Sequence, residues 1–317
     1  MSILNKLEKQ GVIHPPNWLI ANTHYLTLMG SIAYGVSSDS SDSDVYGFTI
    51  PRKDQIFPHL SGEIPGFGKQ INRFSQWSEH HIIDRDTQKE YDFTVYSIIT
   101  YFQLLMDNNP NMVDSLFTPD NCVIHSTQIG NLVRDNRKIF LHKGCWPKFK
   151  GYSYSQLHKM SIKNPEPGSK RYADIMKNGY DTKFAYHVFR LLDEVQQILT
   201  LHDLDLQRSR EQMKAIRRGE WTEPDIRDYF SREEKNLEKI YAESTLPWGP
   251  DEDKIKQLLL DCLIMFFYAH DNLPNSRILR ALSLILVLLS WIGIIIFWVI
   301  YIFNHFIKFL YNWIKNG

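Results

Sequence analysis

The chain has 317 residues, with 36 lysines and arginines against 36 aspartates and glutamates. A formal net charge of zero excludes a strong overall field that would attract a polyanion to the whole surface. The cysteines are few, odd in number and without metal-ligand spacing, which excludes a disulfide framework and favours a reducing compartment. The length is enough for about two domains.

Two predicted strands, residues 25–29 and 45–50, flank a polar turn near the N-terminus. Both segments are apolar and short enough for strands. Gly30 and Ser31 follow the first strand directly. Glycine lets the backbone approach a phosphate closely, and the amide groups at a helix start bind anions. The serine adds a hydroxyl donor, so this turn is a candidate phosphate-binding element.

A pair of carboxylates begins the second strand. Asp42 and Asp44 are two residues apart, so their side chains point to the same face of a strand. Two carboxylates on one face repel each other unless a cation or a proton lies between them. Mg²⁺ prefers oxygen ligands and is commonly held by one or two carboxylates together with substrate phosphates. We therefore expect a magnesium site at this strand.

Residues 51–89 form a poorly periodic insertion with several prolines and glycines, which is typical of a loop or a β-ribbon. His80 and His81 lie within it and are adjacent. Adjacent side chains point apart on a strand or a helix, so a surface loop is favoured here over a metal site.

A third strand is expected at residues 90–94, followed by a helix over residues 95–106 that Thr94 would cap. Asp92 lies in this apolar strand, where a partly buried carboxylate needs a partner. Its place on a strand favours it as the third acid of the site. Nothing local separates it from three other acids nearby, Asp84, Asp86 and Glu90.

From about residue 128 the pattern is helical, with predicted helices over residues 128–140, 149–162, 182–202, 208–218, 223–243 and 251–267. The best-formed helix, 182–202, carries Lys183, His187 and Arg190 on one face. Taken alone, such a set is typical of a solvated face. Residues 146–190 have an excess of lysine and arginine with interleaved tyrosines, which is a hint of a polyanionic partner.

The C-terminal part differs in composition. Residues 281–303 contain no charged side chain and are long enough to cross a bilayer, which needs about 20 residues. The first residues, 1–11, have no apolar region typical of a signal peptide. We therefore expect a single-pass C-terminal membrane anchor, with the larger N-terminal part in the cytoplasm.

The spacing Gly30-Ser31, ten residues, Asp42-x-Asp44 and a later acid on a strand resembles the nucleotidyltransferases of the DNA polymerase beta superfamily. Further motifs look like those of the YcgL-type predicted nucleotidyltransferases. They are Gly30-Ser31-x-Ala33-Tyr34-Gly35, Ser41-Asp42-x-Asp44-Val45-x-Gly47, Asn109-Pro110-Asn111, Lys183-x-Ala185-x-His187-x-x-Arg190, and Ile216-Arg217-Arg218-Gly219-Glu220-Trp221.

This resemblance implies an α+β fold. A polymerase-beta-like nucleotidyltransferase core, with a mixed sheet and flanking helices, would form the catalytic domain at residues 1–127. An all-helical domain would follow at residues 128–275, and residues 276–317 would form the transmembrane tail. Such an anchor departs from the pattern of the family.

The resemblance also implies an enzyme that transfers a nucleoside monophosphate from an NTP to an acceptor hydroxyl and releases pyrophosphate, a reaction of the EC 2.7.7 type. The catalytic residues and ligands of Mg²⁺ or Mn²⁺ would be Asp42, Asp44 and Asp92. The nucleotide-binding residues would be Gly30, Ser31, Lys183, His187 and Arg190. An RNA end, or another polyanion, is a candidate acceptor. The alternative is a catalytically silent module that binds nucleotide or nucleic acid and is tethered to a membrane.

Overall fold

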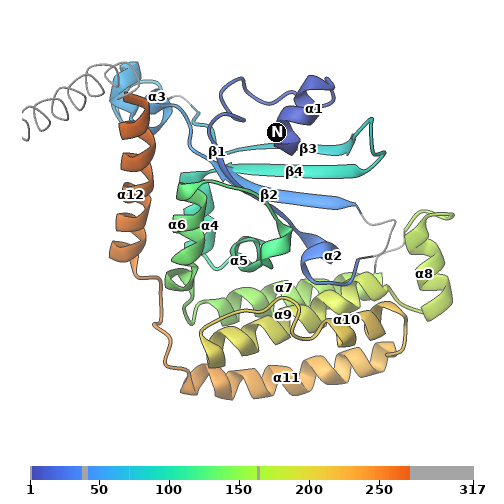
Figure 1. The fold of residues 1–317 in the computed structure, drawn as a ribbon. Coiled ribbons are helices and arrows are strands. Elements are labelled where there is room, and N and C mark those ends of the chain that lie inside the picture. The colour runs from blue at the N-terminus through green and yellow to red at the C-terminus, as the bar shows by residue number, and fades with distance from the viewer. Residues whose placement is uncertain (1, 38–41, 71, 163–164, 272–317) are drawn as a thin grey trace, which may run out of the picture. The chain divides into compact units, whose positions relative to one another are not determined.

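Within residues 2–37, 42–70, 72–162 and 165–271, which a computed structural model describes, five strands form one mixed sheet (Figure 1). Its order is β3-β4-β2-β1-β5. The strands are β1 (Thr23–Leu28), β2 (Ser43–Thr49), β3 (Gln76–Ile83), β4 (Glu90–Ser97) and β5 (Val123–Ser126). The β2–β4 pair is parallel, and the other neighbouring pairs are antiparallel. A mixed sheet in an α+β fold is confirmed.

Helices follow and interrupt the strands. They are α1 (Ile3–Lys9), α2 (Gly30–Ala33), α3 (Lys53–Ile56), α4 (Ile98–Met106), α5 (Pro110–Phe117), α6 (Gln128–Asp135), α7 (Cys145–Ile162), α8 (Lys170–Asn178), α9 (Thr182–Leu201), α10 (Arg210–Arg217), α11 (Glu223–Glu243) and α12 (Glu252–Asp271), with 3₁₀ turns η1 (Pro58–Ser61), η2 (Asp120–Cys122) and η3 (Arg137–Phe140). α4 and α6 pack on the sheet, and α9 packs against α7, α10 and α11 (Figure 1). One compact unit spans Met1–Leu263, and a second begins at Ile264.

The alternation of side chains along β2 and β4 decides which way the acids point. Val45 and Phe93 are fully buried in a core that also holds Leu4 and Leu7 of α1. Asp44 and Asp92 each precede one of these residues by one position, so their side chains point to the opposite face of the sheet. The same alternation therefore presents an apolar face of the sheet to α1 and leaves Asp44 and Asp92 on the opposite face.

The boundary between β4 and α4 differs from the prediction. Thr94 does not cap the helix, because the strand continues to Ser97. The Ser97 side chain accepts a hydrogen bond from the Thr100 amide and is the cap instead. Sequence reasoning also missed β5 and α8, while the insertion before β4 contributes the edge strand β3. The division at residue 127 into catalytic and helical domains stays a prediction.

The expected membrane anchor needs correction. In the part of the chain that the structure describes, no helix is long and apolar enough to span a membrane. The long helices α11 and α12 both carry acidic and basic side chains. The transmembrane helix and the membrane localisation are therefore corrected, since the structure, over the residues it describes, provides no membrane-spanning helix for them. Residues 281–303, from which both were inferred, lie outside the described residues.

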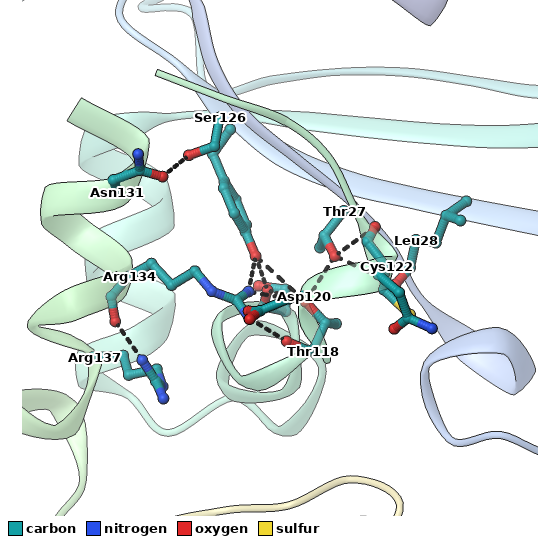
Figure 2. A network of polar contacts seen from close by, with 12 residues as sticks. Thr27, Leu28, Thr118, Asp120, Cys122, Ser126, Asn131, Arg134 and Arg137 are labelled. Carbon is teal, nitrogen blue, oxygen red and sulfur yellow. Dashed lines mark hydrogen bonds and ion pairs between the residues drawn. The ribbon is translucent and has the colours of Figure 1, made fainter. Parts of the chain in front are cut away.

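A network of hydrogen bonds around Arg134 connects α5 to the sheet (Figure 2). The guanidinium of Arg134 donates to the Tyr25 hydroxyl at 2.9 Å, to the Thr118 carbonyl at 2.5 Å and to Asp120 at 2.9 Å. The Tyr25 hydroxyl in turn donates to the Ser115 carbonyl at 2.8 Å. An arginine on α6 thereby links β1 with the C-terminal end of α5.

A second network fastens α5 to the helical half. The guanidinium of Arg190 on α9 pairs with Asp114 of α5, and it donates to the Tyr34 hydroxyl at 2.6 Å and to Glu194 at 3.1 Å. The Tyr34 hydroxyl donates to the same Asp114 oxygen at 2.7 Å. All four side chains are buried, so two carboxylates share one guanidinium away from water.

Two buried carboxyl groups share one guanidinium in this network, so burial favours the protonated form of one of them. Burial raises the pKa of both Asp114 and Glu194, and the guanidinium of Arg190 opposes this for each. Asp114 Oδ2 accepts from both Arg190 and Tyr34, whereas Glu194 accepts from Arg190 alone. One oxygen of each carboxyl group, Asp114 Oδ1 and Glu194 Oε2, has no hydrogen-bond partner among the described residues. We therefore assign the negative charge to Asp114 and the proton to Glu194.

We expect Glu194→Gln to flatten the pH dependence of stability. The folded state keeps the Glu194 proton above the ordinary glutamate pKa of 4.5, whereas the unfolded chain releases it. Stability is therefore lost as pH rises, by about 1.4 kcal/mol per unit until the raised pKa is passed. Glutamine has no proton to lose. Urea unfolding between pH 5 and pH 8 measures the slopes, with the exposed Glu243→Gln as control. Equal slopes in wild type and Glu194→Gln would contradict the assignment.

Candidate active site

A cavity of about 710 Å³ lies between the N-terminal ends of β2 and β4, which carry the acids, and helices α9 and α10. One side presents carboxylates and the other presents basic side chains. Its lining consists of Met29, Gly30, Ser31, Tyr34, Val36, Asp42, Asp44, Tyr46, Asp92, Asn111, Lys183, Tyr186, His187, Lys214, Arg217 and Arg218. Seven of the eight site residues expected from the sequence are among them; the exception is Arg190.

Strand register brings two of the acids together. Asp44 of β2 and Asp92 of β4 are direct partners in the parallel pairing, so both carboxylates stand at the same level of the sheet. Burial raises the pKa of Asp44, and the neighbouring charge of Asp92 raises it further, while Lys183 acts in the opposite direction. Asp42 lies just before β2, is exposed and adds to the negative field at Asp44. The three acids therefore form a region of concentrated negative charge.

Position 30 must be a glycine because the Asp44 carboxylate lies so close to it. Its backbone has φ +62°, a left-handed conformation that L side chains rarely adopt, and a Cβ at this position would overlap Asp44 Oδ2. The amide of Met29 also donates to the Asp44 carbonyl at 2.7 Å. The turn after β1 is thus built directly against the start of β2.

The same turn starts the short helix α2. Met29 occupies the N-cap position and provides no side-chain hydrogen bond to the helix. Met29 thus leaves the amides that open α2 without a cap from its own side chain, and Gly30 and Ser31 both line the cavity. Uncapped amides together with a serine hydroxyl are groups that bind phosphate oxygens.

A bulge in β3 orients Asp92. The register shifts between Glu79 and Ile82, and His81 adopts φ +58°. As a result the His81 amide donates to Asp92 Oδ1 at 2.7 Å, and the His80 imidazole lies 3.7 Å from Asp92 Oδ2. These histidines lie on a bulged strand rather than in the expected loop, and both contact the acid.

The donor set fits a divalent cation. Asp42, Asp44 and Asp92 supply carboxylate oxygens to one cavity. Burial raises the pKa of Asp44, and so does the negative charge of Asp92 and Asp42, which a cation would compensate. His81, Glu90 and Asp92 also form a compact group, with ligand atoms within 4.8 Å of one another. Within that group His81 Nδ1 already lies 2.6 Å from Glu90 Oε1. Asp92 is the one acid common to both sets.

Basic residues from two helices face the acids. Lys183 and His187 come from α9, as the sequence predicted. Burial and the surrounding cations, first among them Arg190 and Lys183, hold the pKa of His187 well below its usual value, so the imidazole is neutral. The guanidinium of Arg217 lies 5.5 Å from the centre of the Tyr186 ring.

Sequence reasoning assigned no role to the residues that α10 adds. These are Lys214 and Arg217, with Arg218 at the C-cap. The motif at residues 216–221 contained a signal for the two arginines, but nothing marked Lys214. Tyr34, Tyr46 and Asn111 also line the cavity. Tyr34 and Asn111 lie within motifs that carried the resemblance, whereas Tyr46 lies in the second predicted strand.

Arg190 does not reach the cavity. Its helical spacing places it on the same side of α9 as Lys183 and His187, but its side chain is buried against Tyr34, Asp114 and Glu194. A direct contact with nucleotide stays a prediction for Lys183 and His187, while Arg190 stands behind the wall of the cavity.

Part of the basic excess at residues 146–190 forms ion pairs within the fold. Lys148 pairs with Asp107 at 3.1 Å, and Arg171 pairs with Asp181. Lys150 lies 2.9 Å from Glu234 and 2.8 Å from Glu238. These pairs weaken the case for a polyanion surface there, and the basic wall of the cavity is the better-supported anion site.

Comparison with known proteins gives three findings. A relative, the uncharacterized 38.9 kDa protein in the nrdC-mobD intergenic region of Enterobacteria phage T4, is 26% identical over 151 residues, which cover 47% of this chain and 41% of that protein. The match thus spans less than half of the relative. A crystal structure of a nucleotidyltransferase-like protein from Exiguobacterium sibiricum 255-15 aligns with 10% identity and a TM-score of 0.27, over 82% of this chain and 74% of that one.

The third finding is a family model. The model described as RlaP, RNA repair pathway DNA polymerase beta family, matches residues 4–248, which is well over half of the chain. The matched range includes the whole lining of the cavity, from Met29 to Arg218. The chain therefore belongs to the RlaP family of the DNA polymerase beta type, within the superfamily of nucleotidyltransferases that the Gly-Ser and Asp-x-Asp spacing resembles.

Proposed function

We propose that this protein is a metal-dependent nucleotidyltransferase that transfers a nucleoside monophosphate from an NTP to an acceptor hydroxyl and releases pyrophosphate. The observation that carries the proposal is the single cavity in which Asp42, Asp44 and Asp92 face the basic residues of α9 and α10. A triphosphate with its counter-ions needs both kinds of charge within one binding site. Membership of a polymerase-beta-type family supports the same reaction class.

Asp42, Asp44 and Asp92 would hold the cation, Mg²⁺ or Mn²⁺. Bound there, it would lower the pKa of the acceptor hydroxyl and neutralise charge on the triphosphate and on the departing pyrophosphate. Two contacts position these ligands for the cation. The His81 amide donates to Asp92 Oδ1, and strand pairing places Asp44 next to Asp92.

The remaining cavity residues would bind the nucleotide. Gly30 and Ser31 offer amide and hydroxyl donors to phosphate oxygens. Lys183 and Arg217 add positive charge from the opposite wall, where it would attract the triphosphate. His187 is held neutral by burial and by the cations around it, so it can donate or accept a hydrogen bond without adding a charge.

An RNA end is the acceptor we favour, because the family is described as part of an RNA repair pathway. The cavity lies at the N-terminal ends of β2 and β4, and Asp42 is exposed there, which would give a polymer end access to the acids. A silent nucleotide-binding module is the competing function. Its signature would be NTP binding without pyrophosphate release.

We expect Asp44→Asn to abolish transfer without unfolding the protein. The full chain, incubated with Mg²⁺, labelled NTPs and total RNA, should label the acceptor and release pyrophosphate. In the variant this rate should fall about a thousandfold, on the order of the loss of a principal electrostatic group. Because burial and Asp92 disfavour the Asp44 charge, the neutral side chain should leave the melting temperature unchanged or raise it.

The exposed Asp253→Asn is the control for the Asp44 change. Wild-type binding of NTP without any transfer would favour the silent module. Full activity in Asp44→Asn would remove Asp44 from the mechanism.

We expect Gly30→Ala to disturb the acids more than the fold. Alanine at φ +62° is strained by about 1 kcal/mol, and its Cβ would push Asp44 Oδ2 aside. Gly11→Ala is a matched control, since Gly11 has φ +66° and open space where a Cβ would lie. Both variants should lose similar stability in thermal unfolding. Only Gly30→Ala should lose transfer activity, about a hundredfold; equal activities would contradict the role of this contact.

A further inference from the structure

Three elements that carry or adjoin the site meet at one buried hydroxyl. Tyr34 follows α2 directly, Asp114 lies in α5 and Arg190 lies in α9. The Tyr34 hydroxyl accepts from Arg190 at 2.6 Å and donates to Asp114 at 2.7 Å. Burial keeps the Tyr34 pKa well above its usual value, so the hydroxyl retains the proton that it donates.

Tyr34 belongs to the phosphate-binding turn as well as to this network. Its backbone amide donates to the Gly30 carbonyl at 3.2 Å, and it is the C-cap residue of α2. Its side chain is only 2% exposed, yet it lines the cavity. A shift of the Tyr34 side chain would therefore move the turn that carries Gly30 and Ser31.

Arg190 connects the same hydroxyl to the opposite wall. It follows His187 by three positions and Lys183 by seven, so the three residues rise along one side of α9. Tyr34 and Arg190 thus link the Gly30–Ser31 turn to the helix that carries Lys183 and His187. Nucleotide phosphates held between the turn and α9 would depend on the separation of the two.

We propose that Tyr34 is a positioning residue whose hydroxyl, held by Arg190 and Asp114, fixes the Gly30–Ser31 turn relative to Lys183 and His187 for nucleotide binding. The inference rests on the proposed function, since it assigns nucleotide to the space between these groups. It also explains why a predicted nucleotide-binding arginine lies behind the cavity wall: Arg190 acts through Tyr34.

Tyr34→Phe isolates this link. Arg190 and Asp114 remain paired without the hydroxyl, and the ring still lies under the guanidinium, whose carbon is 4.5 Å from the ring centre. The change therefore leaves the buried ion pair in place and removes only its connection to α2. Replacing Arg190 or Asp114 would instead leave an unpaired buried charge, which is strongly destabilising.

Tyr25→Phe is the matched control. The Tyr25 hydroxyl is also buried, donates to α5 at the Ser115 carbonyl and accepts from an arginine, Arg134. Each variant loses a buried hydroxyl that accepts from an arginine and donates to an oxygen of α5, the Asp114 carboxylate for Tyr34 and the Ser115 carbonyl for Tyr25. Tyr25 lies in β1 and does not line the cavity.

Hydrogen exchange and steady-state kinetics on the full chain test the proposal. In Tyr34→Phe the amides of residues 30–35 should exchange faster, and the KM for the NTP should rise about tenfold with a smaller change in kcat. Tyr25→Phe should lower the melting temperature by an amount similar to that for Tyr34→Phe. It should leave unchanged both the exchange of the amides of residues 30–35 and the KM for the NTP.

Three results would overturn the inference. They are equal exchange at residues 30–35 in the two variants, an unchanged KM in Tyr34→Phe, or a KM raised equally in both. If the wild-type chain transfers no nucleotide, the proposed function fails by itself. NTP affinity, measured by calorimetry, then replaces KM, and unchanged affinity in Tyr34→Phe overturns the inference. A wild type without NTP affinity overturns both.

Discussion

The parallel pairing of β2 with β4 is the constraint on which the site depends. It places Asp44 directly beside Asp92, and side-chain alternation turns both away from the apolar core under α1. Two partly buried carboxylates in this position destabilise each other unless positive charge is nearby. The basic residues of α9 and α10 lie across the cavity, and oxygen donors of this kind suit a divalent cation. The acid pair thus dictates what the helical half must supply.

Helix α5 connects the two halves that carry these charges. Adjacent residues of α5, Asp114 and Ser115, each accept from a buried tyrosine, and each tyrosine accepts from an arginine. Arg134 approaches from α6 and Arg190 from α9. Buried polar groups of this kind are costly when a partner is missing and specific when all are present. Small displacements between sheet and helices are therefore resisted at a point close to the cavity.

The acids of the site and the Gly30–Ser31 turn could be predicted because their pattern lies within short stretches of sequence. The spacing of Asp42 and Asp44 on one strand, and of Gly30 and Ser31 after another, needs no tertiary contact to be recognised. The basic half could not be predicted in the same way. Helical spacing put Arg190 on the correct side of α9 but could not show that Tyr34 and Asp114 cover it. Similarly, spacing alone says nothing of the strand register or of the distant α10 residues that complete the wall.

The distance along the chain between the two halves has a consequence for protein synthesis. The acids occupy positions 42–92, whereas the facing basic residues begin only at Lys183 and end at Arg218. A nascent chain that stops within α7 can pair β2 with β4 but has nothing opposite the carboxylates. Under the proposed function, the groups that bind a triphosphate are complete only after α10 has emerged from the ribosome. The triphosphate would then stabilise the completed fold and would not assist the early steps of folding.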